Sequence, residues 1–215
     1  MENKGELVKH LVDSGVLETS EIIAAFQKFD RADFVQKEYL DEAYEDHPLP
    51  IGHGQTISQP STVAFMLELL QPKAGEKILD VGSGSGWTTA LLAQIVGPSG
   101  KVFGVELIPA LADFGRKNLE KYNFSWAEIR SAGEKVGLAE EAPFDKILVS
   151  ASGEEIPQEL ISQLKIGPPA SPEKRGGQGG RMVIPVQNSV WKIDKLTKSE
   201  VRKEEFPGFV FVPLK

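Results

Sequence analysis

The chain has no cysteine, which excludes disulfide bonds, thiolate metal sites and a cysteine nucleophile. It also has no apolar run near the roughly 18 residues that a membrane-spanning helix needs. Residues 1–10 (MENKGELVKH) lack the apolar centre of a signal peptide. We therefore expect a soluble, cytoplasmic protein without a membrane partner. Its 215 residues are enough for a single α/β domain over residues 1–215, with some N-terminal additions.

Positive charge is the next shortage. The net charge is −7 and the isoelectric point is near 5.1, which disfavours broad binding to a phosphate backbone. The compact basic cluster, residues 198–203 (KSEVRK), is interrupted by glutamate and is typical of a solvated surface. Nucleic acid is therefore not the expected partner.

The first 45 residues are predicted to be helical. Leu7, Val8, Leu11 and Val12 form one apolar stripe, and Ser20 is a candidate N-cap for a second helix. A polar, turn-rich segment follows, and we treat residues 46–60 as a substrate and active-site segment. The Rossmann-like core is predicted over residues 61–215.

Within that core, helix and strand patterns alternate. Helices are predicted over 60–70, 87–95, 109–122 and 157–164, and strands over 77–81, 101–106, 126–130, 145–150, 181–186, 189–196 and 208–214. Such alternation predicts an α/β fold: a Rossmann-like, doubly wound, mainly parallel sheet with helices on both faces, N-terminal helices and an antiparallel C-terminal edge. The Pro- and Gly-rich insertion 168–179 (PPASPEKRGGQG) is predicted to be a mobile surface loop, either inert or a lid that faces the substrate.

A glycine-rich turn follows the first core strand, in the stretch ILDVGSGSGWT (78–88). Glycine lets the backbone take positive φ and lets a ligand approach closely. In a doubly wound sheet, such a turn at the carboxyl end of a central strand is where ligands bind. We therefore expect Gly82, Ser83 and Gly84 to contact a nucleotide-like ligand.

Two ligands compete for this turn. Dinucleotides prefer G-x-G-x-x-G, with a pyrophosphate at the helix N-terminus, but this chain has G-x-G-x-G with Asp80 two residues before the first glycine. An acid there would repel a diphosphate, whereas the ammonium and sulfonium of S-adenosyl-L-methionine would be attracted, directly or through water. Glu106, at the end of the next strand, suits ribose hydroxyls of either ligand. We favour S-adenosyl-L-methionine over NAD or a purely structural turn.

The residue inventory narrows the methyl acceptor. There is no cysteine for cytosine C5 chemistry, residues 150–154 (SASGE) do not match an N/D-P-P-Y/F motif, and no carboxylate set suggests a metal. His10, His47 and His53 are scattered; His53 is nearest the expected site, as a solvated or positioning residue or as a general base. A carboxylate acceptor needs no base because it is already anionic at pH 7. Hydroxyl and amide donors are enough to position it, and Gln55, Thr56 and Ser58 supply them, although each alone could cap a turn.

Residues 43–70 (AYEDHPLPIGHGQTISQPSTVAFMLELL) carry a more specific signal, above all the combination PLPIG–GQTISQP. Together with ILDVGSGSGWTTALLA, VFGVELIP, AEEAPFDKILV, IPQELISQLK, GRMVIPV and FVFVPL, in that order, they make the chain resemble the protein-L-isoaspartate O-methyltransferase family from about residue 6 to residue 215.

The resemblance implies a monomeric enzyme that methylates the free carboxyl group of isoaspartyl residues in damaged peptides and proteins. The products are the methyl ester and S-adenosyl-L-homocysteine, and loss of methanol then gives a succinimide that can hydrolyse to aspartate. It implies that Ser58 is the active-site residue, holding the substrate by a hydrogen bond and not attacking as a nucleophile. It implies cofactor contacts from Ile57, Ser58, Gln59, Pro60, Asp80, Gly82, Ser83, Gly84 and Glu106.

The chain departs from the family pattern in three places. Ala132-Gly133-Glu134 stands where the family has G-D-G, so Gly133 and Glu134 are the candidates for the adenine contact. Residues 150–154 replace a Thr-Ala-Ala run, and 168–179 expands a short turn. Two alternatives therefore stay open: a divergent enzyme for a small-molecule carboxylate, or a non-catalytic module whose adenine pocket is blocked around Gly133 and Glu134.

Overall fold

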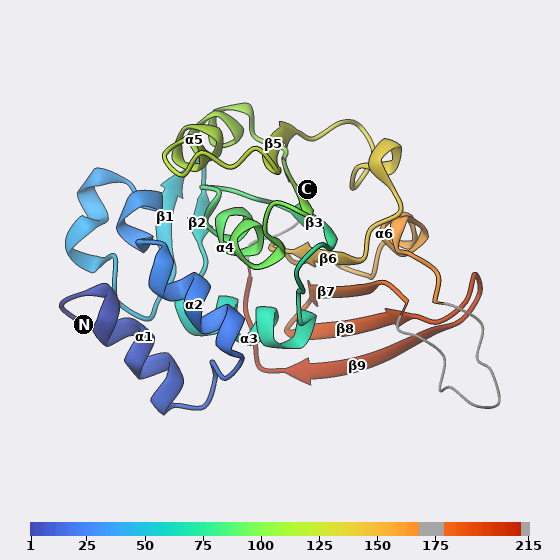
Figure 1. Ribbon diagram of the computed structural model, residues 1–215, viewed down its shortest axis with the longest axis horizontal. Helices are drawn as coiled ribbons and strands as arrows, with labels where there is room; N and C mark the ends of the chain where they lie inside the picture. The colour runs from blue at the N-terminus through green and yellow to red at the C-terminus, as the bar shows by residue number, and fades with distance from the viewer. Residues whose placement is uncertain (168–178, 212–215) are drawn as a thin grey trace.

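The computed structural model describes residues 1–167 and 179–211, which contain a seven-stranded sheet (Figure 1). The strand order is β5-β4-β3-β6-β7-β8-β9. Strands β5 (Ala127–Ser131), β4 (Lys101–Glu106), β3 (Lys77–Val81), β6 (Lys146–Val149) and β7 (Arg181–Val186) are parallel, and β8 (Ser189–Lys195) and β9 (Val201–Pro207) are antiparallel. The predicted fold class, with its antiparallel C-terminal edge, is confirmed.

The inner parallel strands β3, β4, β6 and β7 are buried on both faces, which explains why they are nearly continuous apolar runs. One face packs on helices α3 (Pro60–Leu70), α4 (Trp87–Val96) and α5 (Pro109–Glu120), with Ile78 and Val102 in that core. The other face packs on α6 (Gln158–Gln163), the 3₁₀ turn η3 (Ala139–Glu141) and its flanking chain, with Leu79 and Phe103 in that core. Consecutive strand residues thus alternate between the two cores.

The N-terminal part packs outside α3 and α4 (Figure 1). Helices α1 (Lys4–Asp13) and α2 (Ser20–Lys28) are as predicted, but residues 29–45 form two 3₁₀ turns, η1 (Arg31–Phe34) and η2 (Lys37–Glu42). The predicted cap at Ser20 is wrong, because Thr19 is the N-cap and its hydroxyl donates to Glu68 at 2.5 Å. Val12 is partly exposed, at the edge of the predicted stripe.

The turn-rich segment contains a hairpin that was not predicted, formed by β1 (Leu49–Gly52) and β2 (Gln55–Ile57). Its two-residue turn has positive φ at His53 and Gly54, the combination that matches the twist of paired strands. The pattern LPIGHGQTI carries that signal, but its short strands were hidden among proline and glycine. Gln55 and Thr56 therefore lie on a fixed strand and not on a loose turn.

The last predicted strand, 208–214, is wrong for residues 208–211, which follow β9 without strand structure. The strand is instead VRKEEFP, an edge strand whose charged side chains are exposed and therefore lack an apolar period. Its first residues belong to the basic cluster 198–203, which is exposed as predicted. The insertion falls almost entirely outside the described residues. No helix within the described ranges has the length and apolar character needed to cross a membrane.

Candidate active site

A pocket of about 330 Å³ lies at the carboxyl edge of the parallel strands. It lies at β3, where the chain, having added β4 and β5 on one side of this strand, crosses to the other side to add β6 and β7. Ligands bind at such a reversal in doubly wound sheets because the crossover helices on its two sides leave a crevice there. The β1–β2 hairpin and the start of α3 cover one side of the pocket and contribute Ile51, Ile57 and Val63 to its lining. The segment 46–60 therefore completes the pocket that the strands of the Rossmann-like core form.

The glycine-rich turn forms the floor of the pocket between β3 and α4. Gly82 and Gly84 have φ of +79° and +51°, a region that favours glycine. A Cβ on Gly84 would come within 3.1 Å of Ile51 Cδ1, so a side chain there would press on the hairpin. Ser83 adds a buried hydroxyl with no hydrogen-bond partner among the described residues. This floor leaves room and an unused polar atom for a ligand.

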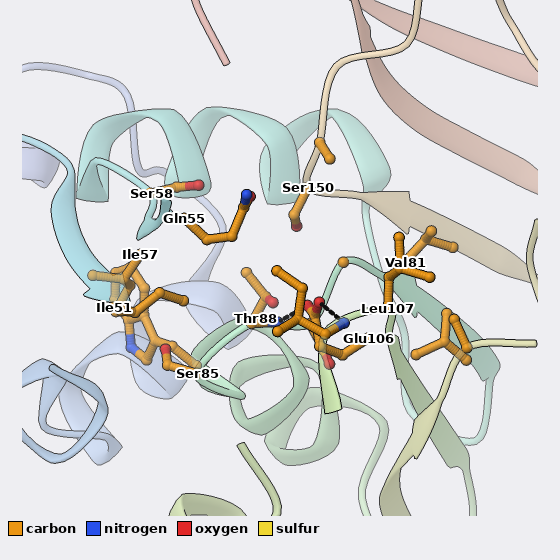
Figure 2. A pocket seen from close by; sticks show the side chains of 18 of the residues that line it. Ile51, Gln55, Ile57, Ser58, Val81, Ser85, Thr88, Glu106, Leu107 and Ser150 are labelled. Atoms are coloured by element: carbon orange, nitrogen blue, oxygen red, sulfur yellow. Dashed lines mark hydrogen bonds between the residues drawn. The ribbon is translucent and has the colours of Figure 1, made fainter. Parts of the chain in front are cut away.

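Glu106, at the end of β4, lies on the wall opposite the hairpin and is 7% exposed (Figure 2). Its Oε2 accepts the Gly84 N–H at 2.9 Å, and its Oε1 accepts the Ile108 N–H at 2.9 Å. These two bonds fix the carboxylate while lone pairs on both oxygens remain free. Glu106 is therefore placed and oriented to accept ribose hydroxyls.

Asp80, which was expected to attract the ligand directly or through water, lies behind the pocket lining. Its carboxylate is fully buried and does not line the pocket; Oδ2 accepts the hydroxyls of Thr88 at 2.7 Å and Thr89 at 2.6 Å. Oδ1 has no partner within the described residues, and burial raises the pKa of Asp80 to about 6. An unpaired buried oxygen is costly, so a cationic ligand group or a bridging water would be favourable there. Thr88 does line the pocket and connects Asp80 to it.

The segment after β5 forms the outer end of the pocket, with Leu107, Gly133, Glu134 and Val136. An added Cβ at Gly133 would meet no atom within 4 Å, so the pocket is open where a non-binding module should be blocked. The apolar side chains suit a flat base, and Glu134 is an exposed rim residue.

A buried amide that the sequence analysis missed holds this segment in place. Gln163, on α6, is 4% exposed; its Oε1 accepts the Leu138 N–H at 2.8 Å and its Nε2 donates to the Val136 carbonyl at 3.0 Å. Gly137 packs so tightly between them that a Cβ would lie 2.5 Å from Gln163 Oε1. A polar residue on the apolar face of the predicted 157–164 helix was the available signal.

The inner end of the pocket is lined by hydroxyl and amide groups from two separate elements. Gln55, Thr56 and Ser58 come from the hairpin segment, and Ser150 follows β6. Figure 2 shows Gln55, Ser58 and Ser150 on one side of the cavity and Glu106 on another. Within the described residues, the side chains of Gln55, Thr56, Ser58 and Ser150 have no hydrogen-bond partner in the protein. They are free to donate to a bound anion.

Most of the predicted site residues meet in this pocket. The lining includes Gln55, Thr56, Ile57, Ser58, Gly82, Ser83, Gly84, Glu106, Gly133 and Glu134. Gln59, Pro60 and Asp80 do not line it: Pro60 is buried as the first residue of α3, and Gln59 is that helix's N-cap. The sequence analysis missed Trp87 and Thr88 as lining residues, and it singled out Ser150 only as part of the divergent run 150–154.

The three histidines lie away from the pocket lining. His53 is exposed at the hairpin turn, His47 faces Glu42, and His10 lies 3.9 Å from Asp46. The site thus combines free neutral donors with no lining histidine, which suits an acceptor that is already ionised.

A doubly wound sheet with this glycine turn, the acid after β4 and the unpaired oxygen beside the turn defines a class I S-adenosyl-L-methionine-dependent methyltransferase. The model of the family Protein-L-isoaspartate(D-aspartate) O-methyltransferase matches residues 2–215, and the chain belongs to this family. The predicted family, enzyme class and cofactor are thereby confirmed.

Relatives and solved structures agree with this assignment. The Methanopyrus kandleri protein-L-isoaspartate O-methyltransferase is 41% identical over 213 residues, covering 97% of this chain and 89% of the relative. An Archaeoglobus fulgidus relative of the same name, numbered 2, is 44% identical over 197 residues, covering 90% and 84%. A Plasmodium falciparum structure assigned to this enzyme type, in complex with S-adenosyl-L-homocysteine, has a TM-score of 0.82 at 25% identity and covers 100% of this chain and 99% of its own.

Proposed function

We propose that this protein transfers a methyl group from S-adenosyl-L-methionine to the free carboxyl group of L-isoaspartyl residues in damaged peptides and proteins. The observation that carries the proposal is the set of side-chain donors at the inner end of the pocket that have no hydrogen-bond partner in residues 1–167 and 179–211: Gln55, Thr56, Ser58 and Ser150. The resulting ester loses methanol to form a succinimide, and hydrolysis of the succinimide can return a normal aspartyl residue.

Cofactor binding is assigned to the floor and walls of the pocket. Glu106 accepts the ribose hydroxyls, Gly82, Ser83 and Gly84 allow close approach, and Gly133, Glu134, Leu107 and Val136 surround the adenine. Asp80 acts from behind Thr88, with its Oδ1 available to the ammonium group directly or through water. Gln59 and Pro60 act indirectly, because they begin the helix that follows Ser58.

The chemistry that the cofactor supplies is an electrophilic methyl group on a sulfonium. The protein's part is to bring a carboxylate oxygen into line with that methyl group and to exclude water. Ser58 donates a hydrogen bond to the acceptor carboxyl group, and Gln55 and Ser150 hold the same group or the adjoining peptide bond. No proton has to be removed, since an exposed carboxyl group has a pKa of about 4.

The smaller-scale expectations belong to the same proposal. The net charge of −7 supports the proposal that the protein does not act on nucleic acid. We also propose that the whole chain is one domain and that the protein is a monomer in the cytoplasm. Size-exclusion chromatography with light scattering tests the monomer; a stable dimer at micromolar concentration would contradict it.

A pair of matched peptides tests the function. Purified protein, radiolabelled S-adenosyl-L-methionine and two peptides that differ only in one L-isoaspartyl or L-aspartyl residue are incubated together. We expect label in the isoaspartyl peptide and none in the aspartyl peptide. Equal labelling of both, or of neither, contradicts the proposal. Binding of S-adenosyl-L-homocysteine without labelling of either peptide would instead favour a different acceptor.

A further inference from the structure

Arg31, in the N-terminal part, is a buried cation that the site described so far does not use. Its side chain is 1% exposed, and no carboxylate forms an ion pair with it in the part of the chain that the structure describes. Burial lowers the pKa of its guanidinium to about 10, so the group is cationic at neutral pH. The nearby Asp46 carboxylate attracts this charge but does not form a direct ion pair with it, so hydrogen bonds must supply the rest of the stabilisation.

Backbone carbonyls supply that stabilisation, and they come from the chain on both sides of the β1–β2 hairpin. Nη1 donates to the carbonyls of Ala43 at 2.8 Å and Glu45 at 3.4 Å. Nη2 donates to the carbonyls of His47 at 3.0 Å and Ser58 at 3.2 Å. One planar, forked group therefore joins the chain that enters the β1–β2 hairpin to the residue that leaves it.

The guanidinium also contacts the helix that follows the glycine-rich turn on the floor of the pocket. It lies 5.5 Å from the ring centroid of Trp87, the first residue of α4, and Trp87 lines the pocket next to Thr88. Such a cation–π contact contributes more when it is desolvated. Arg31 thus contacts both the backbone of Ser58 and a side chain of the cofactor turn, although its Nε has no partner among the described residues.

We propose that Arg31 is a positioning residue for the methyl transfer, which fixes Ser58 and the hairpin relative to the cofactor turn. This inference rests on the proposed function. Arg31 acts through main-chain atoms and does not touch the substrate. A misplacement of about 1 Å can lower a rate about 100-fold. Because the forked set of N–H donors fixes the position of Ser58, we expect the reaction to require this fork and not the positive charge alone.

Two variants, Arg31→Lys and Arg31→Met, separate positioning from stability. Lysine keeps the charge but has one nitrogen in place of the planar fork. We expect kcat on the isoaspartyl peptide to fall at least about tenfold in Arg31→Lys and further in Arg31→Met. The dissociation constant for S-adenosyl-L-homocysteine, measured by calorimetry, should change less than about threefold in Arg31→Lys, because the Glu106 wall is untouched.

Glu68→Ala is the matched control, because Glu68 also anchors the N-terminal part, through Glu18 and Thr19, but lies outside the pocket. It should lower the midpoint of thermal unfolding with kcat unchanged. Hydrogen exchange gives a readout that does not need activity: in Arg31→Lys, amides of residues 49–58 should exchange faster while those of 101–106 do not. Normal kcat and unchanged exchange in Arg31→Lys overturn the proposal. Wild-type protein that is inactive on the peptide, with exchange still faster in the variant, refutes the proposed function and leaves the positioning role.

Discussion

The Gly84 N–H donates to Glu106 Oε2 at 2.9 Å, so the glycine turn after β3 and the acid after β4 form one unit. The same carboxylate accepts the Ile108 N–H through its other oxygen. Both donors are backbone N–H groups, and together they hold Glu106 in one orientation, which suits the proposed contact with ribose hydroxyls. A change in the acid therefore acts on the ligand and on the shape of the turn at once.

Glu106→Gln should weaken binding of S-adenosyl-L-homocysteine about 10- to 100-fold. The amide has lost one acceptor oxygen, and its NH₂ group would face the N–H of Gly84 or Ile108. Hydrogen bonds to charged groups contribute about 1.5–3 kcal/mol each. Calorimetry measures the change, and Glu128→Gln, a surface carboxylate on β5 that pairs with Arg130, is the control. Equal affinity of wild type and Glu106→Gln would remove Glu106 from the ribose site.

Ser58→Ala should lower kcat on an isoaspartyl peptide about tenfold or more, since it deletes a donor to the reacting carboxyl group. Affinity for S-adenosyl-L-homocysteine should be almost unchanged. The control is Ser61→Ala, because Ser61 is the second residue of α3 and does not line the pocket. An unchanged kcat in Ser58→Ala, measured at saturating peptide, would show that another donor positions the acceptor.

Asp80 predicts a pH dependence of cofactor binding. Burial raises the pKa of Asp80 to about 6 in the free protein, so the carboxyl group is mostly ionised at pH 7 and becomes protonated as the pH falls below 6. Only the ionised form attracts an ammonium group, and affinity is therefore retained above the pKa and lost below it. Between pH 7.5 and pH 5 we expect affinity for S-adenosyl-L-homocysteine to fall about tenfold.

Asp80→Asn provides the comparison for this profile. The variant should bind more weakly at pH 7.5 and show little change between pH 7.5 and pH 5, because the titrating group is gone. A profile in Asp80→Asn that is as steep as in wild type would assign the titration to another group.

Gln163→Leu should raise the KM for S-adenosyl-L-methionine about tenfold and leave the KM for the peptide unchanged. Its side chain supports the segment after β5 through Val136 and Leu138 and, within the described residues, forms no hydrogen bond with the hairpin segment that holds Ser58. Two lost hydrogen bonds to main-chain groups account for a loss of about 1–3 kcal/mol. Ser162→Ala, on the exposed side of the same helix, is the control. A rise in the peptide KM alone would contradict this assignment.

Much of the fold could be predicted from the sequence, and most of the predicted site residues line the pocket, because both depend on local patterns. Strands such as 101–106 and 181–186 are buried apolar runs, and their bounds agree with the structure. Ser58 lies in the motif GQTISQP and Glu106 ends the strand KVFGVE, so local sequence was enough to place both residues near the glycine-rich turn. The β9 edge strand was missed because exposed charges on both sides hide its period.

Other features depend on contacts between distant parts of the chain and left no local signal. Arg31 and Ser58 are 27 positions apart, and a lone arginine in a helical stretch looks like a surface residue. The position of Asp80 before the glycines predicted an attraction to the ligand, either direct or through water, but did not show that Thr88 in the first turn of α4 lies between Asp80 and the pocket. Charge and spacing identified the right residue types but could not give their distance from the ligand.

The chemical nature of the transferred label is the most direct test of the central claim, that unpaired neutral donors position a carboxylate. The isoaspartyl peptide is treated with S-adenosyl-L-methionine and this protein, and mass spectrometry follows the product. We predict a gain of one methylene mass at the isoaspartyl residue, released as methanol by mild base with formation of the succinimide. A base-stable methyl group on nitrogen or a hydroxyl oxygen would contradict the account.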